Sequence, residues 1–373
     1  MKIAVNARLL FGNQLEGVAR YTHEINRRLV QLRPQDEFLF CFDRPFLDQY
    51  IYGSNVSGKV IFPAARHPIL WYTWFEWVLP GILRRWKADV FISQDAHLPL
   101  RSKVPTLLTV HDLAYAHYPD QVPLSVRMFY QRYVPKFIRK AEVITAVSQY
   151  TKTDILDKIP EVEKEIHVIP NGKPQSWEPL SGDEKDIALK KWSSGKPFFC
   201  TLGSIHPRKN ILGTIEAFNL FKEKYKTEHE LLIIGRMAWQ SSPVQKAISQ
   251  SPYKTCIHMM GFQPNESVRE ILGASDALLF LSFFEGFGVP LLEAMQLDVP
   301  LVYSDQSSLP EVAGAAGIPV DPNDQAAAAE AMHLVLKEDI RRKFSLEAKA
   351  RLEKYDWDQS ARQVSNLIDQ YFS

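Results

Sequence analysis

The sequence contains few cysteines. Only three occur among 373 residues, and these three, Cys41, Cys200 and Cys256, lie far apart. An odd number at this spacing indicates neither a disulfide framework nor a metal-binding motif, so we expect a reducing compartment. No cluster of His, Cys, Asp and Glu side chains suggests a transition-metal site either.

The sequence also lacks an excess of one charge and a long hydrophobic run. Lys and Arg number 44 and Asp and Glu 43, a net charge of +1, which argues against a dedicated nucleic-acid-binding protein. A transmembrane helix needs about 18 or more apolar residues. The nearest stretch, residues 69–83, is interrupted by Glu76 and Pro80. The N-terminus has no cleavage-site pattern and predicts a first β-strand, so we expect a cytoplasmic protein.

Two nucleotide-binding motifs are absent. The first predicted strand–helix junction has no G-x-G-x-x-G, and the later Gly286-Phe287-Gly288 lacks the third glycine. No G-x-x-x-x-G-K-[ST] occurs anywhere in the chain. Both a dehydrogenase and a P-loop enzyme are therefore disfavoured.

The composition and the hydrophobic pattern indicate an α/β protein. Hydrophobic residues make up 46% and charged residues 23%, as in ordinary globular proteins, and the length favours two domains. Short apolar runs alternate with longer amphipathic stretches, which predicts parallel sheets with helices on both faces. In the first half, the predicted strands are residues 3–6, 38–42, 60–62, 90–93, 106–110 and 143–147, and the predicted helices are 17–32 and 124–141. In the second half, the strands are 198–202, 231–234, 257–260, 277–281, 301–303 and 318–320, and the helices are 210–224, 264–273, 290–296 and 324–337.

A change of composition indicates the domain boundary. Residues 167–182 are rich in Pro, Gly, Asn and Ser, which favour turns. We therefore predict an N-terminal domain at 1–178, a second domain at 179–356, and a C-terminal amphipathic helix at 357–373. Ligands of open parallel sheets bind beyond the carboxyl ends of the strands, so we expect the chemistry in the loops that follow the strands.

The segment SFFEGFGVPLLE follows the apolar strand that is predicted to end at residue 281. Its two glycines allow a close approach of the backbone to a ligand, and Pro290 suits the first turn of a helix. The free N–H groups there would form an anion site. Glu285 and Glu293 would offer carboxylates to sugar hydroxyls. The alternative is a glycine-rich connection with two solvated glutamates.

The segment GSIHPRKN, residues 203–210, follows another predicted strand. Asn210 is suited to cap the next helix. Arg208 and Lys209 lie beside that helix N-terminus, where cations oppose the helix dipole and need an anionic partner. A diphosphate fits this requirement, whereas the alternative is an exposed basic turn.

Two weaker candidates lie in the first half. His111 follows a predicted strand and is placed to contact a substrate hydroxyl; the alternative is a structural histidine with Asp112 as a helix cap. Gly17 opens the first predicted helix, where backbone N–H groups would approach a phosphate.

Together these segments resemble the retaining GT-B glycosyltransferases of family 4, and within them bacterial mannosyltransferase-like enzymes. The resemblance lies in the E-x7-E element of EGFGVPLLEAM and in GSIHPRKN, with support from EGVARYT, TVHDL, AVSQYTKTDI, VIPNG and SDQSSLPEVAGAAGIPVDP. It extends through nearly the whole chain and is more specific in the second domain. One segment departs from the pattern: Ser93-Gln94 stands where relatives often carry a histidine, and His97 comes later.

The resemblance implies an α/β fold of two Rossmann-like domains that face a deep cleft. It implies a retaining hexosyltransferase of polysaccharide biosynthesis, which moves a hexose, with mannose favoured, to a sugar or lipid-linked glycan acceptor. The donor would be GDP-mannose or a UDP-hexose, and no metal or other cofactor would be required. The implied catalytic residues are Glu285, His111, Lys209 and Arg208. The implied donor-binding residues are Gly17, Gly203, Ser204, Arg208, Lys209, Phe262, Gly286, Phe287, Gly288, Val289 and Glu293.

Residues 69–87 are dense in aromatic side chains and end in a basic cluster. Aromatic residues beside cations are typical of contacts with a membrane surface. A peripheral contact at the inner face of the membrane is therefore one hypothesis, and a helix that packs in the core is the alternative.

Two other functions stay open from the sequence. One is a sugar-nucleotide epimerase or hydrolase on a similar two-domain fold. The other is a non-catalytic sensor of nucleotide sugars.

Overall fold

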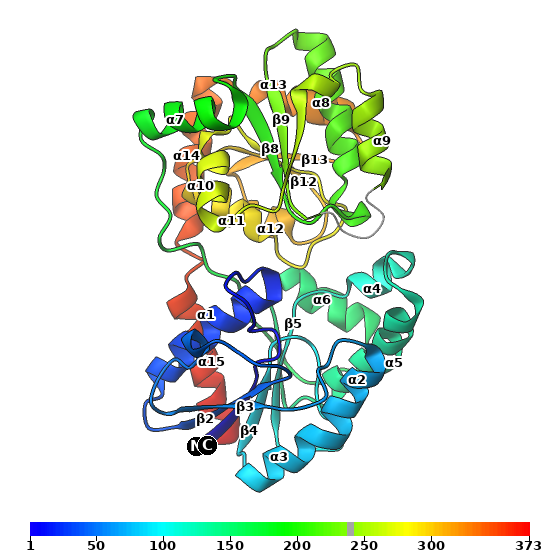
Figure 1. Ribbon diagram of the computed structural model, residues 1–373, viewed down its shortest axis with the longest axis vertical. Helices are drawn as coiled ribbons and strands as arrows, with labels where there is room; N and C mark the ends of the chain where they lie inside the picture. The colour runs from blue at the N-terminus through cyan, green and yellow to red at the C-terminus, as the bar shows by residue number, and fades with distance from the viewer. Residues whose placement is uncertain (237–241) are drawn as a thin grey trace. The chain divides into compact units, whose positions relative to one another are not determined.

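The computed structural model describes residues 1–236 and 242–373, and the chain divides into two units. One unit comprises Met1–Asn171 and Asp356–Ser373, and the other comprises Gly172–Tyr355 (Figure 1). The boundary thus follows Asn171, whereas the sequence placed it after residue 178. The C-terminal segment is part of the first unit.

The first unit is built on a seven-stranded parallel sheet with the order β3-β2-β1-β4-β5-β6-β7. The order reverses at the pair β1 and β4, which creates a topological switch point. The strands are β1 (Lys2–Asn6), β2 (Glu37–Phe42), β3 (Val56–Val60), β4 (Val90–Ser93), β5 (Thr106–Val110), β6 (Val143–Ala146) and β7 (Ile166–Val168). The helices are α1 (Gly17–Leu32), α2 (Pro68–Tyr72), a π-helical turn (Thr73–Val78), α3 (Leu79–Trp86), α4 (Ala114–His117), α5 (Leu124–Lys140), α6 (Gln149–Lys158) and α15 (Trp357–Phe372).

The last helix, α15, completes the first unit by packing along α1 (Figure 1). Arg28 of α1 forms an ion pair with Asp358, and Arg33 Nη1 lies 2.8 Å from Asp369 Oδ1. The ring of Trp357 meets Tyr21 edge-on, with centroids 5.8 Å apart. The end of the chain therefore contributes to the core of the unit in which the chain begins.

The second unit is built on a six-stranded parallel sheet with the order β10-β9-β8-β11-β12-β13. Its strands are β8 (Phe198–Leu202), β9 (Glu230–Ile234), β10 (Ile257–Gly261), β11 (Leu278–Phe280), β12 (Leu301–Ser304) and β13 (Gly317–Val320). Its helices are α7 (Gly182–Ser193), α8 (Ile211–Tyr225), α9 (Ser242–Gln250), α10 (Asn265–Ala274), α11 (Val289–Gln296), α12 (Leu309–Ala313), α13 (Gln325–Leu334) and α14 (Glu338–Leu352).

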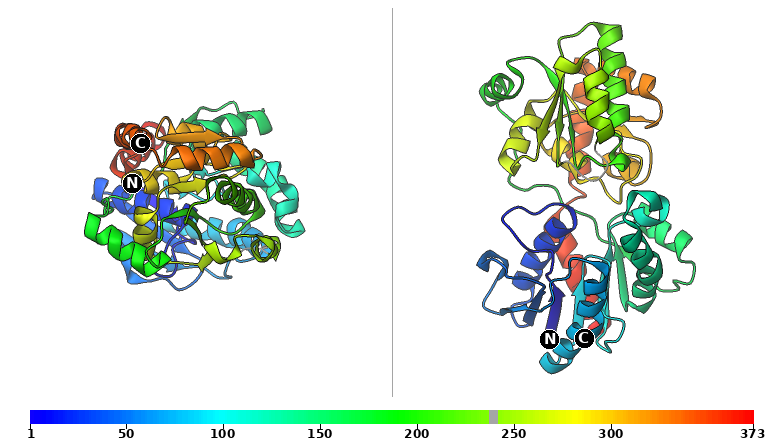
Figure 2. Two further views of the ribbon diagram at one scale, coloured as in Figure 1. Left: turned by 90° about the horizontal axis from the view of Figure 1, so that it is seen from above. Right: turned by 45° about the vertical axis from the view of Figure 1, so that its right-hand side comes forward.

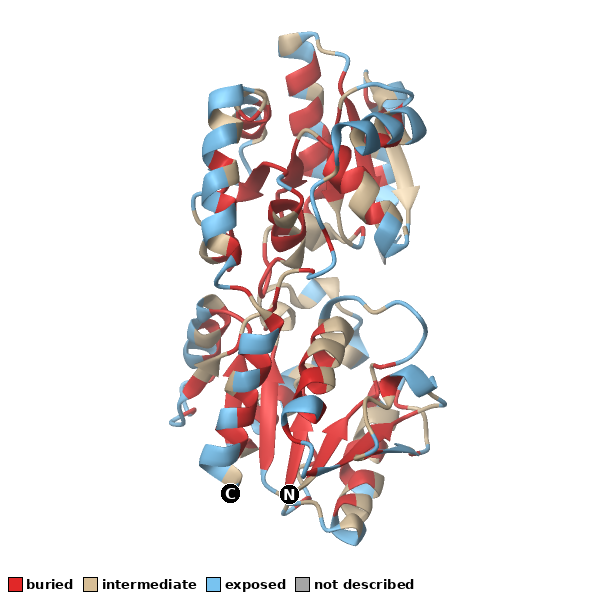
Figure 3. Cartoon of the chain, turned by 90° about the vertical axis from the view of Figure 1, so that its left-hand side faces the viewer, coloured by how far each residue is buried: buried red, intermediate tan, exposed pale blue. Residues whose placement is uncertain are grey.

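Helices cover both faces of each sheet, which confirms the predicted α/β class (Figures 1 and 2). The central strands are buried on both faces, as their continuous apolar runs require (Figure 3). Among the described residues, no helix combines the length and the apolar character needed to cross a membrane.

Three predicted elements differ from the structure. The strand expected at 60–62 is β3, which runs from Val56 to Val60. Its three middle residues, Ser57-Gly58-Lys59, are exposed and interrupt the apolar pattern, so the prediction overlaps it only at Val60. The short edge strand β7 lies partly inside the segment predicted as a linker. The helix expected at 324–337 is α13, which ends at Leu334, and a second helix that was not predicted, α14, begins at Glu338.

Candidate functional site

Glycines occupy the carboxyl ends of three adjacent strands in the second unit. Gly203 follows β8, Gly235 follows β9, and Gly261 ends β10, all with positive φ (141°, 153° and 66°). A Cβ atom on Gly235 would lie 1.8 Å from the carbonyl oxygen of Gly203, so no other residue fits there. The three strand ends therefore offer bare backbone to a ligand. Gly203 was predicted from sequence as a site residue, whereas Gly235 was not.

The turn that carries Arg208 and Lys209 is fixed at both ends. Before it, His206 Nδ1 accepts a hydrogen bond from the Arg208 N–H at 3.3 Å. After it, Asn210 has a left-handed backbone (φ 51°) and its Oδ1 accepts from the Gly213 N–H at 3.1 Å. Asn210 therefore caps α8, as predicted, and its Nδ2 donates to the Pro322 carbonyl at 2.7 Å.

Arg208 and Lys209 both reach the carboxylate of Glu285. Lys209 Nζ lies 2.5 Å from Glu285 Oε1, and Arg208 Nη1 lies 3.2 Å from Glu285 Oε2. Burial alone would raise the pKa of Glu285, but the two cations outweigh it and hold that pKa below its usual value. The carboxylate is therefore charged at neutral pH. Two cations thus meet one carboxylate, and Lys209 lies beside Gly203 at the end of β8.

The loop that carries Glu285 is held by two serines of the next connection. Ser307 Oγ accepts a hydrogen bond from the Glu285 N–H at 3.0 Å. The buried Ser308 hydroxyl donates to the carbonyls of Glu285 and Phe287, at 2.9 and 3.0 Å. Ser307 is itself left-handed, with φ 57°. Both serines lie in the segment SDQSSLPEVAGAAGIPVDP, which supported the resemblance, but neither was named as a site residue.

The glycine-rich loop leads directly into α11. Gly286 and Phe287 are buried in the loop, and Gly288 (φ 102°) precedes Val289, the first residue of the helix. Glu293, within α11, is buried as well. Because both glutamates are buried, the alternative of two solvated carboxylates is wrong.

An exposed aromatic side chain follows the end of β10. Phe262 is 40% exposed, and the Arg236 guanidinium lies 4.2 Å from the centre of its ring. Ser204, which follows Gly203, is also exposed. Arg236 was missed from sequence, since nothing in the spacing places it over Phe262.

The other two predicted residues lie in the first unit. His111 follows β5, and its Nε2 lies 2.9 Å from the Gln94 carbonyl oxygen. Asp112 accepts a hydrogen bond from the Ala114 N–H at 2.9 Å, at the start of α4, although the N-cap position of that helix is Leu113. Gly17 is the exposed first residue of α1, with φ 51°.

The aromatic segment at residues 69–87 packs mostly in the core. Trp74 and Phe75 are buried, and the half-buried Trp71 stacks on Tyr130, with ring planes 6° apart. Trp77 is the exception, because it is 62% exposed and the Arg101 guanidinium lies 4.0 Å from its ring centre. For most of these side chains the core-packing interpretation is therefore correct.

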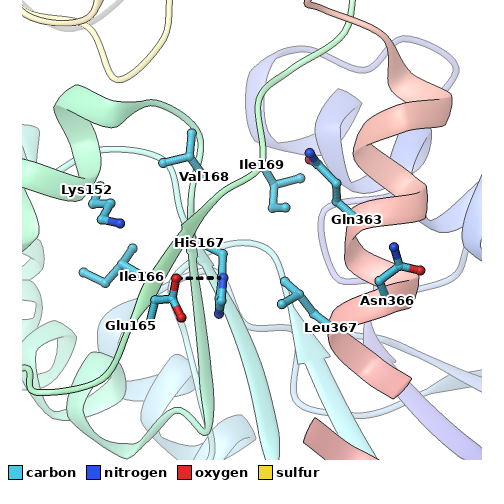
Figure 4. Close-up of a pocket in the computed structure, with 9 residues that line it drawn as sticks. All are labelled: Lys152, Glu165, Ile166, His167, Val168, Ile169, Gln363, Asn366 and Leu367. Atoms are coloured by element: carbon cyan, nitrogen blue, oxygen red, sulfur yellow. Dashed lines mark ion pairs between the residues drawn. The ribbon is translucent and has the colours of Figure 1, made fainter. Parts of the chain in front are cut away.

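A groove of about 440 Å³ lies in the first unit between the edge strand β7 and helix α15 (Figure 4). Gln363, Asn366 and Leu367 of α15 line one side, and Glu165 and His167 form an ion pair at 3.8 Å along the strand. Among the described residues that line this groove, none is a predicted site residue. In the described part of the chain there is also no group of three or more His, Cys, Asp or Glu side chains that could hold a metal ion.

Comparison with known proteins identifies the family. Residues 15–173 match the model of Glycosyltransferase Family 4, and residues 183–355 match that of Glycosyl transferases group 1. The chain is 26% identical over 365 residues to O-antigen chain mannosyltransferase B of Escherichia coli, covering 94% of this chain and 95% of that protein. It is also 26% identical over 322 residues to O-antigen chain mannosyltransferase RfbU of Salmonella typhimurium, covering 84% and 83%.

Solved structures show the same fold. Anabaena HepE, in complex with UDP and glucose, superimposes with a TM-score of 0.76 at 14% identity, covering 99% of this chain and 100% of that one. With two parallel-sheet domains, two family matches that together span most of the sequence, and mannosyltransferases as relatives, the chain belongs to the family 4 glycosyltransferases of the GT-B fold.

Proposed function

We propose that the protein transfers mannose, with retention of anomeric configuration, from a nucleoside-diphosphate sugar to a glycan acceptor. The observation that carries this proposal is the cluster of Arg208, Lys209 and Glu285 beside the three glycine strand ends. It combines two cations, which suit a diphosphate, a buried carboxylate, which suits sugar hydroxyls, and glycine backbone in one place.

The donor diphosphate would bind Arg208 and Lys209. Negative charge grows on the leaving phosphate as the glycosidic bond breaks, and fixed cations aimed at it lower the barrier. The backbone N–H groups at the start of α11, from Val289, would add a further anion site. With this much positive charge from the chain, we propose that neither a metal ion nor another cofactor is needed.

The rest of the donor would lie along the same loops. Glu285 would bind hydroxyls of the sugar near the anomeric carbon, and Glu293 the ribose. The backbone of residues 286–289 would line the sugar-phosphate, and Phe262 would lie near the base.

Four further residues complete the proposed site. Gly203 and Ser204 would contact the donor from the loop after β8. Gly17 and His111 are the contributions that we propose from the first unit.

Retention is proposed to occur by attack on the front face of the sugar. Glu285 is engaged by two cations, which makes it a poor nucleophile for a double displacement. In the front-face route the anomeric carbon–phosphate oxygen bond breaks, and the acceptor oxygen bonds to the anomeric carbon on the same face. The acceptor's proton passes to the departing phosphate oxygen.

The names of the relatives guide the choice of substrates. Two relatives are O-antigen chain mannosyltransferases, which supports GDP-mannose as donor and a sugar or lipid-linked glycan as acceptor in polysaccharide biosynthesis. The complex of HepE with UDP and glucose supports a UDP-hexose as the second candidate. Transfer to an acceptor would separate this function from an epimerase, a hydrolase or a sensor.

A thermal-shift panel of nucleoside diphosphates and their sugars tests the donor. A ligand at 100 times its Kd stabilises the folded state by about 2.7 kcal/mol, so the preferred donor should give the largest shift. Mannose transfer should then persist in EDTA. Loss of transfer in EDTA would contradict metal independence.

Removal of either charged partner tests the site. Glu285→Ala and Lys209→Ala should each lower turnover by a factor of about 10² to 10³ while the fold stays intact, because each removes transition-state stabilisation. Lys191→Ala is the control, since Lys191 pairs with Glu270 on the surface of the same unit. Near-normal turnover in both site variants would contradict the proposed site.

Peripheral membrane contact through residues 69–87 is a separate proposal. Because most aromatic side chains of this segment pack in the core, the proposal rests on the exposed Trp77 and on Ile69, which is 70% exposed. The exposed cations Arg84 and Arg85 lie nearby in sequence. Co-sedimentation with anionic liposomes at low salt should be reduced by Trp77→Ala. Absence of binding by the unchanged protein would rule the contact out.

A further inference from the structure

The loop after β4 is anchored by a buried polar network at the β1/β4 switch point. Asn6 Nδ2 donates to Ser93 Oγ at 3.0 Å and to Asp95 Oδ1 at 2.9 Å. Arg8 Nε donates to Asp95 Oδ2 at 2.5 Å, and the Arg8 and Asp95 side chains are only 10% and 6% exposed. Each carboxylate oxygen of Asp95 is thereby tied to the loop after β1. The proposed transfer reaction does not use any of these residues.

The network fixes the position of one backbone carbonyl. Gln94 precedes Asp95, and its side-chain Oε1 accepts from Asn26 Nδ2 of α1 at 2.7 Å. Both amide side chains are buried. The Gln94 side chain and the neighbouring Asp95 thus fix the backbone at Gln94. The main-chain carbonyl oxygen of Gln94 lies 2.9 Å from His111 Nε2.

This contact determines which nitrogen of His111 carries the proton. A carbonyl oxygen only accepts hydrogen bonds, so Nε2 must be the donor. Burial lowers the pKa of His111, although the Gln94 carbonyl, Asp112 and Asp95 oppose it, so the ring is neutral at pH 7. Nδ1 is then unprotonated, and it has no hydrogen-bond partner among the described residues. The edge of Tyr21, 4.9 Å between centroids and perpendicular, restrains the ring plane.

We propose that the Gln94–Asp95 turn, anchored by Asn6 and Arg8, is a positioning element that holds His111 as the Nε2–H tautomer, so that Nδ1 accepts a hydrogen bond from a substrate hydroxyl. His111 is then neither a cation for the phosphates nor a proton donor. Asp95, with both oxygens engaged, is a positioning residue and does not touch substrate. The hydroxyl contact rests on the proposed function, whereas the tautomer does not.

Nitrogen NMR of the imidazole rings tests the tautomer in the unliganded full chain. The spectrum of ¹⁵N-labelled protein at pH 7 should contain one neutral ring with a protonated Nε2 and an unprotonated Nδ1 that disappears in His111→Asn. A His111 signal with Nδ1 protonated, or with both nitrogens protonated, would overturn the proposal. This measurement needs no substrate and no assay of activity.

A matched pair of variants tests the positioning role. Asp95→Asn should convert the His111 signal into an average of tautomers and lower turnover about tenfold. The control is Asp36→Asn, because Asp36 forms an equally buried pair with Arg33 in the same unit, with side chains 4% and 7% exposed. The control should leave both the tautomer and the turnover unchanged. If Asp95→Asn does not fold, Arg8→Lys, which keeps the charge, takes its place.

The positioning role and the hydroxyl contact are contradicted by different results. A folded Asp95→Asn or Arg8→Lys variant that keeps a single Nε2–H tautomer would overturn the positioning role. Full turnover in His111→Ala would instead contradict the hydroxyl contact within the proposed function, while the tautomer assignment would stand.

Discussion

Each unit buries a carboxylate in a loop beyond the carboxyl ends of its parallel strands, but the two carboxylates have different partners. In the second unit, Glu285 faces two cations, Arg208 and Lys209. In the first unit, Asp95 faces Arg8 and is completed by the amide of Asn6. The first arrangement brings two cations to one carboxylate, whereas the second pairs one carboxylate with one cation and completes it with an amide. One favours the binding of an anion, and the other favours a fixed loop.

The two units also differ in the residues at the carboxyl ends of their strands. In the second unit, Gly203, Gly235 and Gly261 expose backbone at three neighbouring strands. In the first unit, Asn6 and Ser93 end the neighbouring strands β1 and β4 with hydrogen-bonded side chains. The same sheet topology therefore ends in glycine backbone in one unit and in hydrogen-bonded side chains in the other.

The sharpest test of this difference is Gly235→Ala. The new Cβ would lie 1.8 Å from the Gly203 carbonyl oxygen in a backbone conformation with φ 153°, so we expect a loss of about 4 kcal/mol or more in the free energy of unfolding. Urea denaturation measures it. Gly182→Ala, where no atom lies within 4 Å of the added Cβ, is the control and should be nearly neutral. Equal stability of the two variants would mean that the glycine strand ends are not closely packed.

A somewhat smaller effect is expected for Asp95→Asn, which leaves Arg8 buried without its anion. We expect a loss of about 3 kcal/mol at pH 7, measured by denaturation. Burial alone would raise the pKa of Asp95, but Arg8 and His97 outweigh the effect of burial and hold this pKa well below its ordinary value. The contribution of Asp95 is therefore fully present above about pH 5 and declines as pH falls below about 4. The difference in the free energy of unfolding between the unchanged protein and Asp95→Asn should therefore become smaller as the pH falls below about 4.

The control for this prediction is Asp120→Asn, whose side chain is 92% exposed beside Arg127 in the same unit. Its free energy of unfolding should change by less than about 0.5 kcal/mol. If the cost of Asp95→Asn were equally small, the Arg8–Asp95 pair would not anchor the loop.

The smallest effect is expected for the binding of a nucleoside diphosphate to Glu285→Gln. Removing the anion that occupies Arg208 and Lys209 should tighten binding of GDP or UDP about tenfold, or about 1.4 kcal/mol, even as turnover is lost. Calorimetric titration measures this. Glu270→Gln, which removes a surface partner of Lys191, should bind the nucleotide as the unchanged protein does. Weaker binding to Glu285→Gln would show that Glu285 supports the diphosphate and does not compete with it.

The second unit was the easier one to predict, because its site lies in contiguous motifs. The segment 203–210 and the loop at 282–293 each carry their charges, glycines and helix start within a dozen residues. The pairing of Glu285 with Lys209 was not predicted, since it joins loops that are 76 residues apart in sequence. The contacts of Ser307 and Ser308 with the Glu285 backbone were not predicted either, since they join positions 22 and 23 residues apart.

The first unit shows where sequence patterns fail. Its polar network joins β1, β4 and α1, and neither Arg8 nor Asp95 lies in a motif that spacing alone makes visible. The edge strand β3 was misplaced and the short β7 was missed, because an edge strand need not be apolar or long.

The α/β class, the two parallel-sheet domains and the loops that carry Arg208, Lys209 and Glu285 could all be predicted from the sequence. These are local properties, because periodicity and turn residues act over a few positions along the chain. The folded chain was needed to see which charges meet, that glycine backbone forms three neighbouring strand ends, and which nitrogen of His111 faces the Gln94 carbonyl. Those depend on strand order, which brings distant segments together and cannot be read from neighbouring residues.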